Sequence, residues 1–78
     1  MITVKLYGLL RLDSGIRGLS VDAATVAELY ARLLENTDRI TRKDLYGCVL
    51  LVNGKAVSRR ARLADGDVVQ LMPPVAGG

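Results

Sequence analysis

One strongly amphipathic helix is predicted in the first half of the chain, and its apolar side must pack against another element. Thr25 and Glu28 have the spacing of a capping box, in which the threonine hydroxyl accepts from a backbone N–H one turn later. Apolar residues then recur at helical spacing and form a single stripe: Val26, Leu29, Tyr30, Leu33 and Leu34. The other regular segments are strand-like, so the chain is predicted to fold as a helix layered on a sheet.

These strand-like segments occur on both sides of the helix. We expect strands at residues 2–7, 19–22, 48–52, 55–57 and 68–72. Residues 48–52 are apolar throughout, which predicts a strand buried on both faces, and Asn53-Gly54 is typical of the hairpin turn that follows. The first and last strands are expected side by side in the middle of the sheet. Residues 11–18 and 41–44 are polar and are expected to form a turn and a loop.

Histidine is absent from the 78 residues, and cysteine occurs once, as Cys48. A nucleophile paired with histidine, an internal disulfide and a four-thiolate metal site are therefore excluded within this chain. Catalytic groups are expected to come from another protein. This chain is expected to bind no metal and no cofactor. Cys48 lies in an apolar run, where cysteine usually behaves as an inert small hydrophobe.

The charge balance gives no reason to expect a nucleic-acid or membrane partner. The net charge is +3, but aromatic residues make up only 4% of the chain, so no base-stacking platform is predicted. The sequence has no run of about 18 apolar residues that could cross a membrane, and its first residues lack the layout of a signal peptide. A cytoplasmic location is expected.

The last six residues have the composition of a projecting tail. Two prolines follow the last strand and favour an extended path, and the side chains then diminish to two glycines, which can pass through a narrow channel. A frayed terminus is the alternative for such a segment. We predict a domain of residues 1–72 and a tail of residues 73–78 that presents the carboxylate of Gly78 to another protein's active site. The tail residues expected to bind there are Pro73, Pro74, Val75, Ala76 and Gly77.

Three stretches of the sequence resemble the small, sulfur-carrying subunit of molybdopterin synthase: residues 52–54, 63–69 and 73–78. The resemblance implies the ubiquitin-like β-grasp fold, an α+β fold with a mixed four- to five-stranded sheet and one main helix on one face. It also implies that an ATP-dependent activating enzyme adenylates Gly78 and that a sulfur donor system converts the adenylate to a thiocarboxylate. The sulfur then reaches a pterin precursor in the large synthase subunit, so the chain is not catalytic alone.

Other members of this group of carriers remain as alternatives. Thiamine-pathway sulfur carriers also end in two glycines after an Asp-Gly-Asp turn and a strand, and a ubiquitin-like modifier would join Gly78 to lysines of other proteins. Pro73, Pro74 and Val75 favour the molybdopterin branch. The sequence does not separate molybdenum from tungsten, and it does not identify the sulfur donor.

A docking surface is expected beside the tail. Tyr7 and Met72 lie on the faces of their strands opposite Val4 and Leu71. If those strands are neighbours, Tyr7 and Met72 form an exposed apolar patch that Val75 continues, and such a patch suits partner docking.

Overall fold

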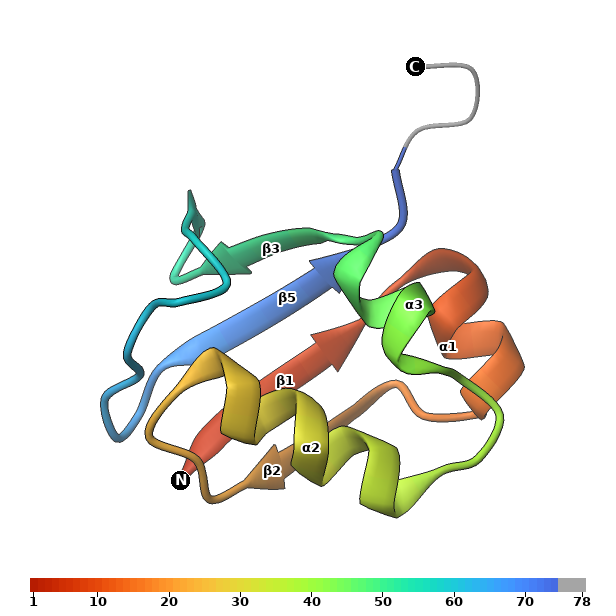
Figure 1. The fold of residues 1–78 in the computed structure, drawn as a ribbon, viewed down its shortest axis with the longest axis horizontal. Helices are drawn as coiled ribbons and strands as arrows, with labels where there is room; N and C mark the ends of the chain where they lie inside the picture. Colours follow the sequence, from red (N-terminus) through yellow and green to blue (C-terminus); the bar gives the residue numbers. More distant parts are fainter. Residues whose placement is uncertain (75–78) are drawn as a thin grey trace.

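The computed structural model describes residues 1–74, and within them a five-stranded sheet forms one layer and helices the other (Figure 1). The strands are β1 (Ile2–Leu6), β2 (Gly18–Val21), β3 (Val49–Val52), β4 (Lys55–Ala56) and β5 (Val68–Met72). The helices are α1 (Gly8–Ser14), α2 (Val26–Asn36) and α3 (Arg42–Tyr46). The tail positions Val75, Ala76, Gly77 and Gly78 lie outside the described residues, so the division into a domain and a tail stays a prediction.

The strand order in the sheet is β2-β1-β5-β3-β4. Strands β1 and β5 are neighbours inside the sheet, as the sequence predicted. They run parallel with Leu6 opposite Leu71, and the other pairings are antiparallel. Because β1 and β5 run in the same direction, both strands finish at the same end of the sheet, and the residues that follow them lie close together. Figure 1 shows α1 and the start of the C-terminal segment together at that end.

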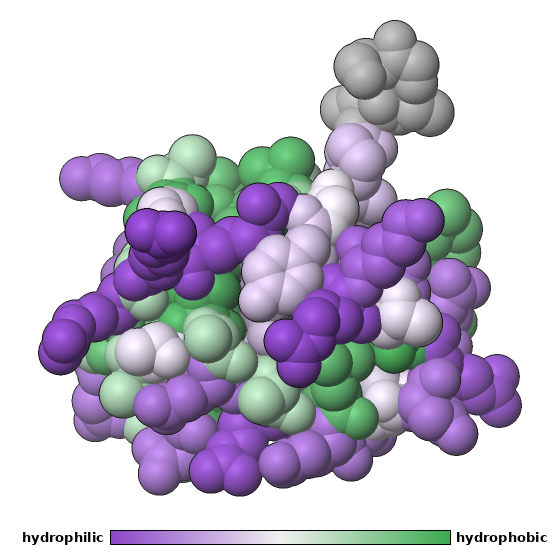
Figure 2. All heavy atoms as spheres, viewed as in Figure 1, coloured by the Kyte–Doolittle hydropathy of each residue, from purple (hydrophilic) through white to green (hydrophobic). Residues whose placement is uncertain are grey.

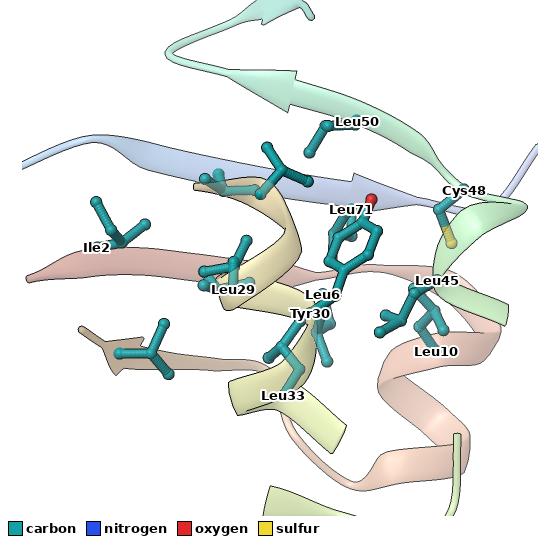
Figure 3. Close-up of a cluster of buried hydrophobic side chains, with 14 of the residues drawn as sticks. Ile2, Leu6, Leu10, Leu29, Tyr30, Leu33, Leu45, Cys48, Leu50 and Leu71 are labelled. Carbon is teal, nitrogen blue, oxygen red and sulfur yellow. The ribbon is translucent and has the colours of Figure 1, made fainter. Parts of the chain in front are cut away.

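The core lies between the sheet and the helices. Alternate residues of β1 and β5 point into it, and the apolar stripe of α2 covers them (Figure 3). Its largest fully buried side chains are Ile2, Leu6, Leu29, Leu33, Leu45, Leu71, Val4, Val26 and Val69. Each such side chain contributes roughly 1.5–3 kcal/mol relative to an exposed position. Tyr30 is 2% exposed, which confirms it as a core residue.

Helix α2 begins as predicted, with one difference at its cap. The Thr25 hydroxyl accepts from the backbone N–H of Glu28 at 3.2 Å. The Glu28 carboxylate instead accepts from the backbone N–H of Ala24, one residue before the cap, at 3.1 Å. Both bonds satisfy donors at the helix start that would otherwise lack partners.

The predicted turn at residues 11–18 and loop at 41–44 are wrong in part, because α1 extends to Ser14 and α3 begins at Arg42. Helix α3 has a full capping box: Thr41 accepts from the backbone N–H of Asp44, and Asp44 accepts from that of Thr41. Each helix inserts one leucine into the core, Leu10 from α1 and Leu45 from α3. Helix α1 has seven residues and α3 has five, which is too few to show a repeating apolar stripe.

The prediction that residues 48–52 form a strand buried on both faces is also wrong. Strand β3 starts at Val49, after Cys48, and the Val49 side chain is 46% exposed. The helices cover only one face of the sheet, so alternate β3 residues lie on the other, open face. The hairpin turn after β3 is confirmed: Asn53 and Gly54 both have positive φ, 52° and 83°, as the favoured two-residue hairpin turn requires.

A side-chain network joins this hairpin to the turn before β5. Asp67 accepts from the backbone N–H of Ala64 at 2.8 Å and from the Asn53 side-chain amide at 2.9 Å. These two hydrogen bonds lower the pKa of the Asp67 carboxyl. The Asn53 side-chain oxygen in turn accepts from the backbone N–H of Val68 at 3.0 Å. The network fixes the start of the strand that leads to the tail.

Candidate functional site

The candidate site begins where the chain leaves β5, at Pro73 and Pro74. Pro73 packs directly against the backbone of Gly8, the first residue of α1. A Cβ added to Gly8 would lie 2.5 Å from Cγ of Pro73, closer than real Cβ atoms approach other atoms, and Gly8 has a φ of +61°. The backbone N–H of Tyr7 donates to Leu71 at 3.2 Å, which extends the β1–β5 pairing up to this point. The root of the tail therefore has a fixed place at the end of the central strands.

The two predicted docking residues lie on the same open face of the sheet. Met72 is 38% exposed, and the hydroxyl of the half-buried Tyr7 accepts from the side-chain amide of Gln70 at 3.0 Å. Gln70 and Met72 are two positions apart on β5 and so point to one face. Val49 pairs with Met72 across β3 and β5. We call Tyr7, Val49 and Met72 the open-face patch. Whether partners dock on it stays a prediction.

Sequence reasoning missed two residues of this site. Val49 was assigned to a strand buried on both faces, so its exposure was not expected. Gly8 was interpreted only as a break after the first strand. A glycine directly after a strand is a weak signal, and its contact with Pro73 follows only from the parallel register of β1 and β5.

On the helix side of the tail root, a groove of about 420 Å³ lies between α1 and α3. Its lining includes Leu9, Leu10, Lys43, Cys48, Pro73 and Pro74. The prolines thus border this groove on one side and adjoin the open-face patch on the other.

Cys48 lines this groove but has the environment of a structural residue. It is 8% exposed, and its thiol donates to the backbone carbonyl of Asp44 at 3.1 Å. Burial raises the pKa of the Cys48 thiol, and the negative charge of Asp44 raises it further. A thiol with a raised pKa stays protonated near neutral pH and is a weak nucleophile. Figure 3 shows Cys48 beside Leu10 and Leu45 at one end of the core.

Two further properties concern residues 1–74. They contain no group of three or more Cys, Asp or Glu side chains placed to hold a metal ion. None of the helices within this part of the chain is long and apolar enough to cross a membrane.

Comparison with known proteins places the chain among small carrier and modifier proteins. Residues 13–78 match the model of the ThiS family. SAMP1 from Haloferax volcanii is 28% identical with a TM-score of 0.81, over 99% of this chain and 98% of that chain. A comparison with curated proteins found no match.

Two other similar structures are complexes with a second protein. One is the complex of subunits 1 and 2 of the molybdopterin-converting factor from Helicobacter pylori. The similar chain in that complex is 27% identical to this chain with a TM-score of 0.73, over 99% of this chain and 97% of that chain. The other is the BexX/CysO complex from Amycolatopsis orientalis, 25% identical with a TM-score of 0.80, over all of both chains. Together with the sheet topology, these likenesses confirm the predicted ubiquitin-like β-grasp fold.

Proposed function

The chain belongs to the ThiS family and is a ubiquitin-like sulfur carrier, and on that premise we propose that it carries sulfur for molybdopterin biosynthesis as a thiocarboxylate on Gly78. Its partners are an adenylating enzyme, a sulfur donor system and the large subunit of a molybdopterin synthase. The chain binds no cofactor of its own, and the adenylating enzyme uses the ATP.

The observation that carries this proposal is the seating of Pro73 on Gly8 at the end of the central strands. The residues that follow Pro74 start from a fixed point rather than from a loosely attached end. Gly77 and Gly78 lack Cβ atoms, so their backbone can enter a channel too narrow for larger residues. The pairing of a similar chain with subunit 2 in the Helicobacter pylori complex supports a partner of the same kind here.

Adenylation and sulfur transfer require only the carboxylate of Gly78 from this chain. An ionised carboxylate is a poor electrophile, and its ordinary pKa of about 3.3–3.7 keeps it ionised at neutral pH. Its oxygen attacks the α-phosphorus of ATP and releases pyrophosphate, which leaves an acyl adenylate. Hydrosulfide supplied by the sulfur donor system then attacks the acyl carbon and expels AMP, and the resulting thiocarboxylic acid loses its proton to give the thiocarboxylate. The protonated, buried thiol of Cys48 has no role in either step.

Deleting Gly78 tests the adenylation step on which the proposal depends. The shortened chain should fold with an unchanged melting temperature, because residues 1–74 carry the core. It should not support ATP–pyrophosphate exchange by the adenylating enzyme, since the reacting carboxylate moves back by about 3.5 Å. Gly77→Val should impair the same exchange, whereas Lys55→Ala, on the outermost strand β4, is the matched control and should not. Normal exchange with the shortened chain would contradict the carrier function.

A role as a protein modifier is the second candidate, and the likeness to SAMP1 favours it. A related structure from Haloferax volcanii, 26% identical with a TM-score of 0.79, is described as small archaeal modifier protein 1. Both roles begin with the same adenylate, so the products decide between them. A thiocarboxylate on Gly78 and sulfur transfer to a pterin precursor support the molybdopterin role. Lysine adducts support the modifier role, and transfer to a thiazole precursor supports the thiamine pathway.

A further inference from the structure

Helix α1 begins against the root of the tail and exposes two leucines. Leu9 is 66% exposed and Leu12 is 74% exposed, whereas Leu10 between them is buried. Residues three apart on a helix are neighbours on one side of it, so Leu9 and Leu12 form a short apolar ridge, which we call the α1 ridge. Figure 2 shows apolar surface at this end of the molecule, near the base of the C-terminal segment.

Neither leucine of the α1 ridge packs into the core of the described fold. Leu9 and Leu12 belong neither to the core cluster nor to the partly buried residues packed against it. Single exposed leucines are common, but an adjacent pair beside a groove is more typical of a contact surface. Leu9 lines the groove of about 420 Å³ together with Pro73 and Pro74, so the ridge and the tail root share one surface.

The length of the tail decides what must lie against this surface. Gly78, which bears the reacting carboxylate in the proposed function, is four residues after Pro74, and an extended chain spans at most about 3.3–3.6 Å per residue. The reacting carboxylate in the proposed function is therefore within roughly 14 Å of Pro74. An adenylating active site must also enclose ATP beyond that carboxylate, so the tail has to be fully inserted. The entrance of the active-site channel then abuts the residues around Pro74, and Leu9 is among them.

We propose that the α1 ridge is a docking surface for the enzyme that adenylates Gly78 and that an apolar part of that enzyme, beside its tail channel, covers Leu9 and Leu12. This inference rests on the proposed function. It adds a second contact surface to the predicted open-face patch, on the other side of the tail root. The enzyme would hold the carrier on both sides of the segment that enters its active site.

The test replaces both leucines by glutamine, a residue of similar helix propensity. The adenylating enzyme is the one that shows Gly78-dependent ATP–pyrophosphate exchange with the unaltered carrier, and exchange is measured over a range of carrier concentrations. For Leu9→Gln/Leu12→Gln we expect the KM for the carrier to rise about ten-fold or more, as for buried contact residues, with kcat unchanged. The melting temperature should also be unchanged, because neither leucine is in the core.

Two controls accompany this variant. Leu9→Met/Leu12→Met keeps an apolar ridge and should retain the KM of the unaltered carrier. Ala31→Gln changes an exposed position on α2, away from the tail root, and should also leave KM unchanged.

Three outcomes would overturn the inference: an unchanged KM for the glutamine variant, a loss of kcat alone, or weaker binding only to the large synthase subunit. Failure of the proposed function looks different: either no adenylating enzyme gives Gly78-dependent exchange with the unaltered carrier, or exchange occurs and no thiocarboxylate forms on Gly78, and neither result depends on Leu9 or Leu12.

Discussion

Replacing Gly8 by alanine should displace the root of the tail, because Gly8 is held in a conformation and a contact that exclude a side chain. Its φ of +61° lies in the left-handed region, which is unfavourable for alanine by about 1–2 kcal/mol. The added Cβ would also lie 2.5 Å from Cγ and 3.1 Å from Cδ of Pro73. Relieving such overpacking typically costs about 1–3 kcal/mol. We therefore expect Gly8→Ala to lower the free energy of unfolding by about 2–5 kcal/mol.

Gly15, the residue that caps the C-terminal end of the same helix, provides the matched control. It has a φ of +73°, but a Cβ added there meets nothing within 4 Å. Gly15→Ala should therefore lower the free energy of unfolding by only the backbone part, about 1–2 kcal/mol. Thermal unfolding of the two variants measures the difference. At about 4–8 °C per kcal/mol for a domain of this size, Gly8→Ala should melt at least about 4 °C below Gly15→Ala.

A second substitution separates the clash from other effects at Gly8. Pro73→Ala removes Cγ and Cδ and leaves Cβ, which lies at an ordinary 3.9 Å from the added atom. The double variant Gly8→Ala/Pro73→Ala should regain the stability lost to the clash, a positive coupling between the two sites. Gly8→Ala alone should also raise the KM of the carrier in ATP–pyrophosphate exchange, and Gly15→Ala should not. Equal melting temperatures for Gly8→Ala and Gly15→Ala would refute the reasoning that Pro73 is seated on Gly8.

Three further predictions concern other parts of the molecule. Cys48→Ala should retain sulfur transfer in a coupled assay, and its free energy of unfolding in urea should fall by about 1–2 kcal/mol, since the buried thiol is structural. Loss of sulfur transfer by a folded variant would show that the thiol takes part in the reaction. Met72→Glu should weaken binding to the adenylating enzyme and to the large synthase subunit in calorimetric titrations, because the charge must be desolvated, with little change in melting temperature. Unchanged affinity for these two proteins would place the docking surface elsewhere. Because the pKa of Asp67 is lowered in the folded state, its stabilisation is present above the ordinary carboxyl pKa and lost as pH falls below about 4. Unfolding measured against pH should show a weaker acid dependence for Asp67→Asn, and identical profiles would contradict this assignment.

Local features of the sequence predicted those elements whose signal is contained within one segment. The stripe of α2 and its Thr25 cap are set by spacing along a single helix, and positive φ at Asn53 and Gly54 follows from the residue types themselves. The short helices α1 and α3 were missed because a helix of one or two turns has too few positions for a periodic signal. The capping residues Thr41 and Asp44 carried the one usable signal for α3.

The exposed side of β3 shows a second reason why part of the structure could not be predicted from the sequence. An apolar run is compatible with burial on both faces or with a surface kept for a partner, and the sequence of the run does not distinguish them. Only the placement of the helices on one face decides that Val49 is exposed and that Leu50 is buried. The open-face patch therefore depends on tertiary packing, although two of its three residues were predicted from strand alternation.

The sequence by itself excluded a nucleophile paired with histidine in this chain and led to the prediction that Gly78 bears the reacting carboxylate, because both follow from which residues are present and in what order. Tertiary structure alone decided what surrounds the base of the tail. Gly8 and Pro73 are at opposite ends of the chain and meet because β1 and β5 pair in parallel with a fixed register. The same pairing brings Leu9 to the tail root. Contacts between distant segments depend on strand order and register across the whole sheet, and no local pattern of residues encodes them.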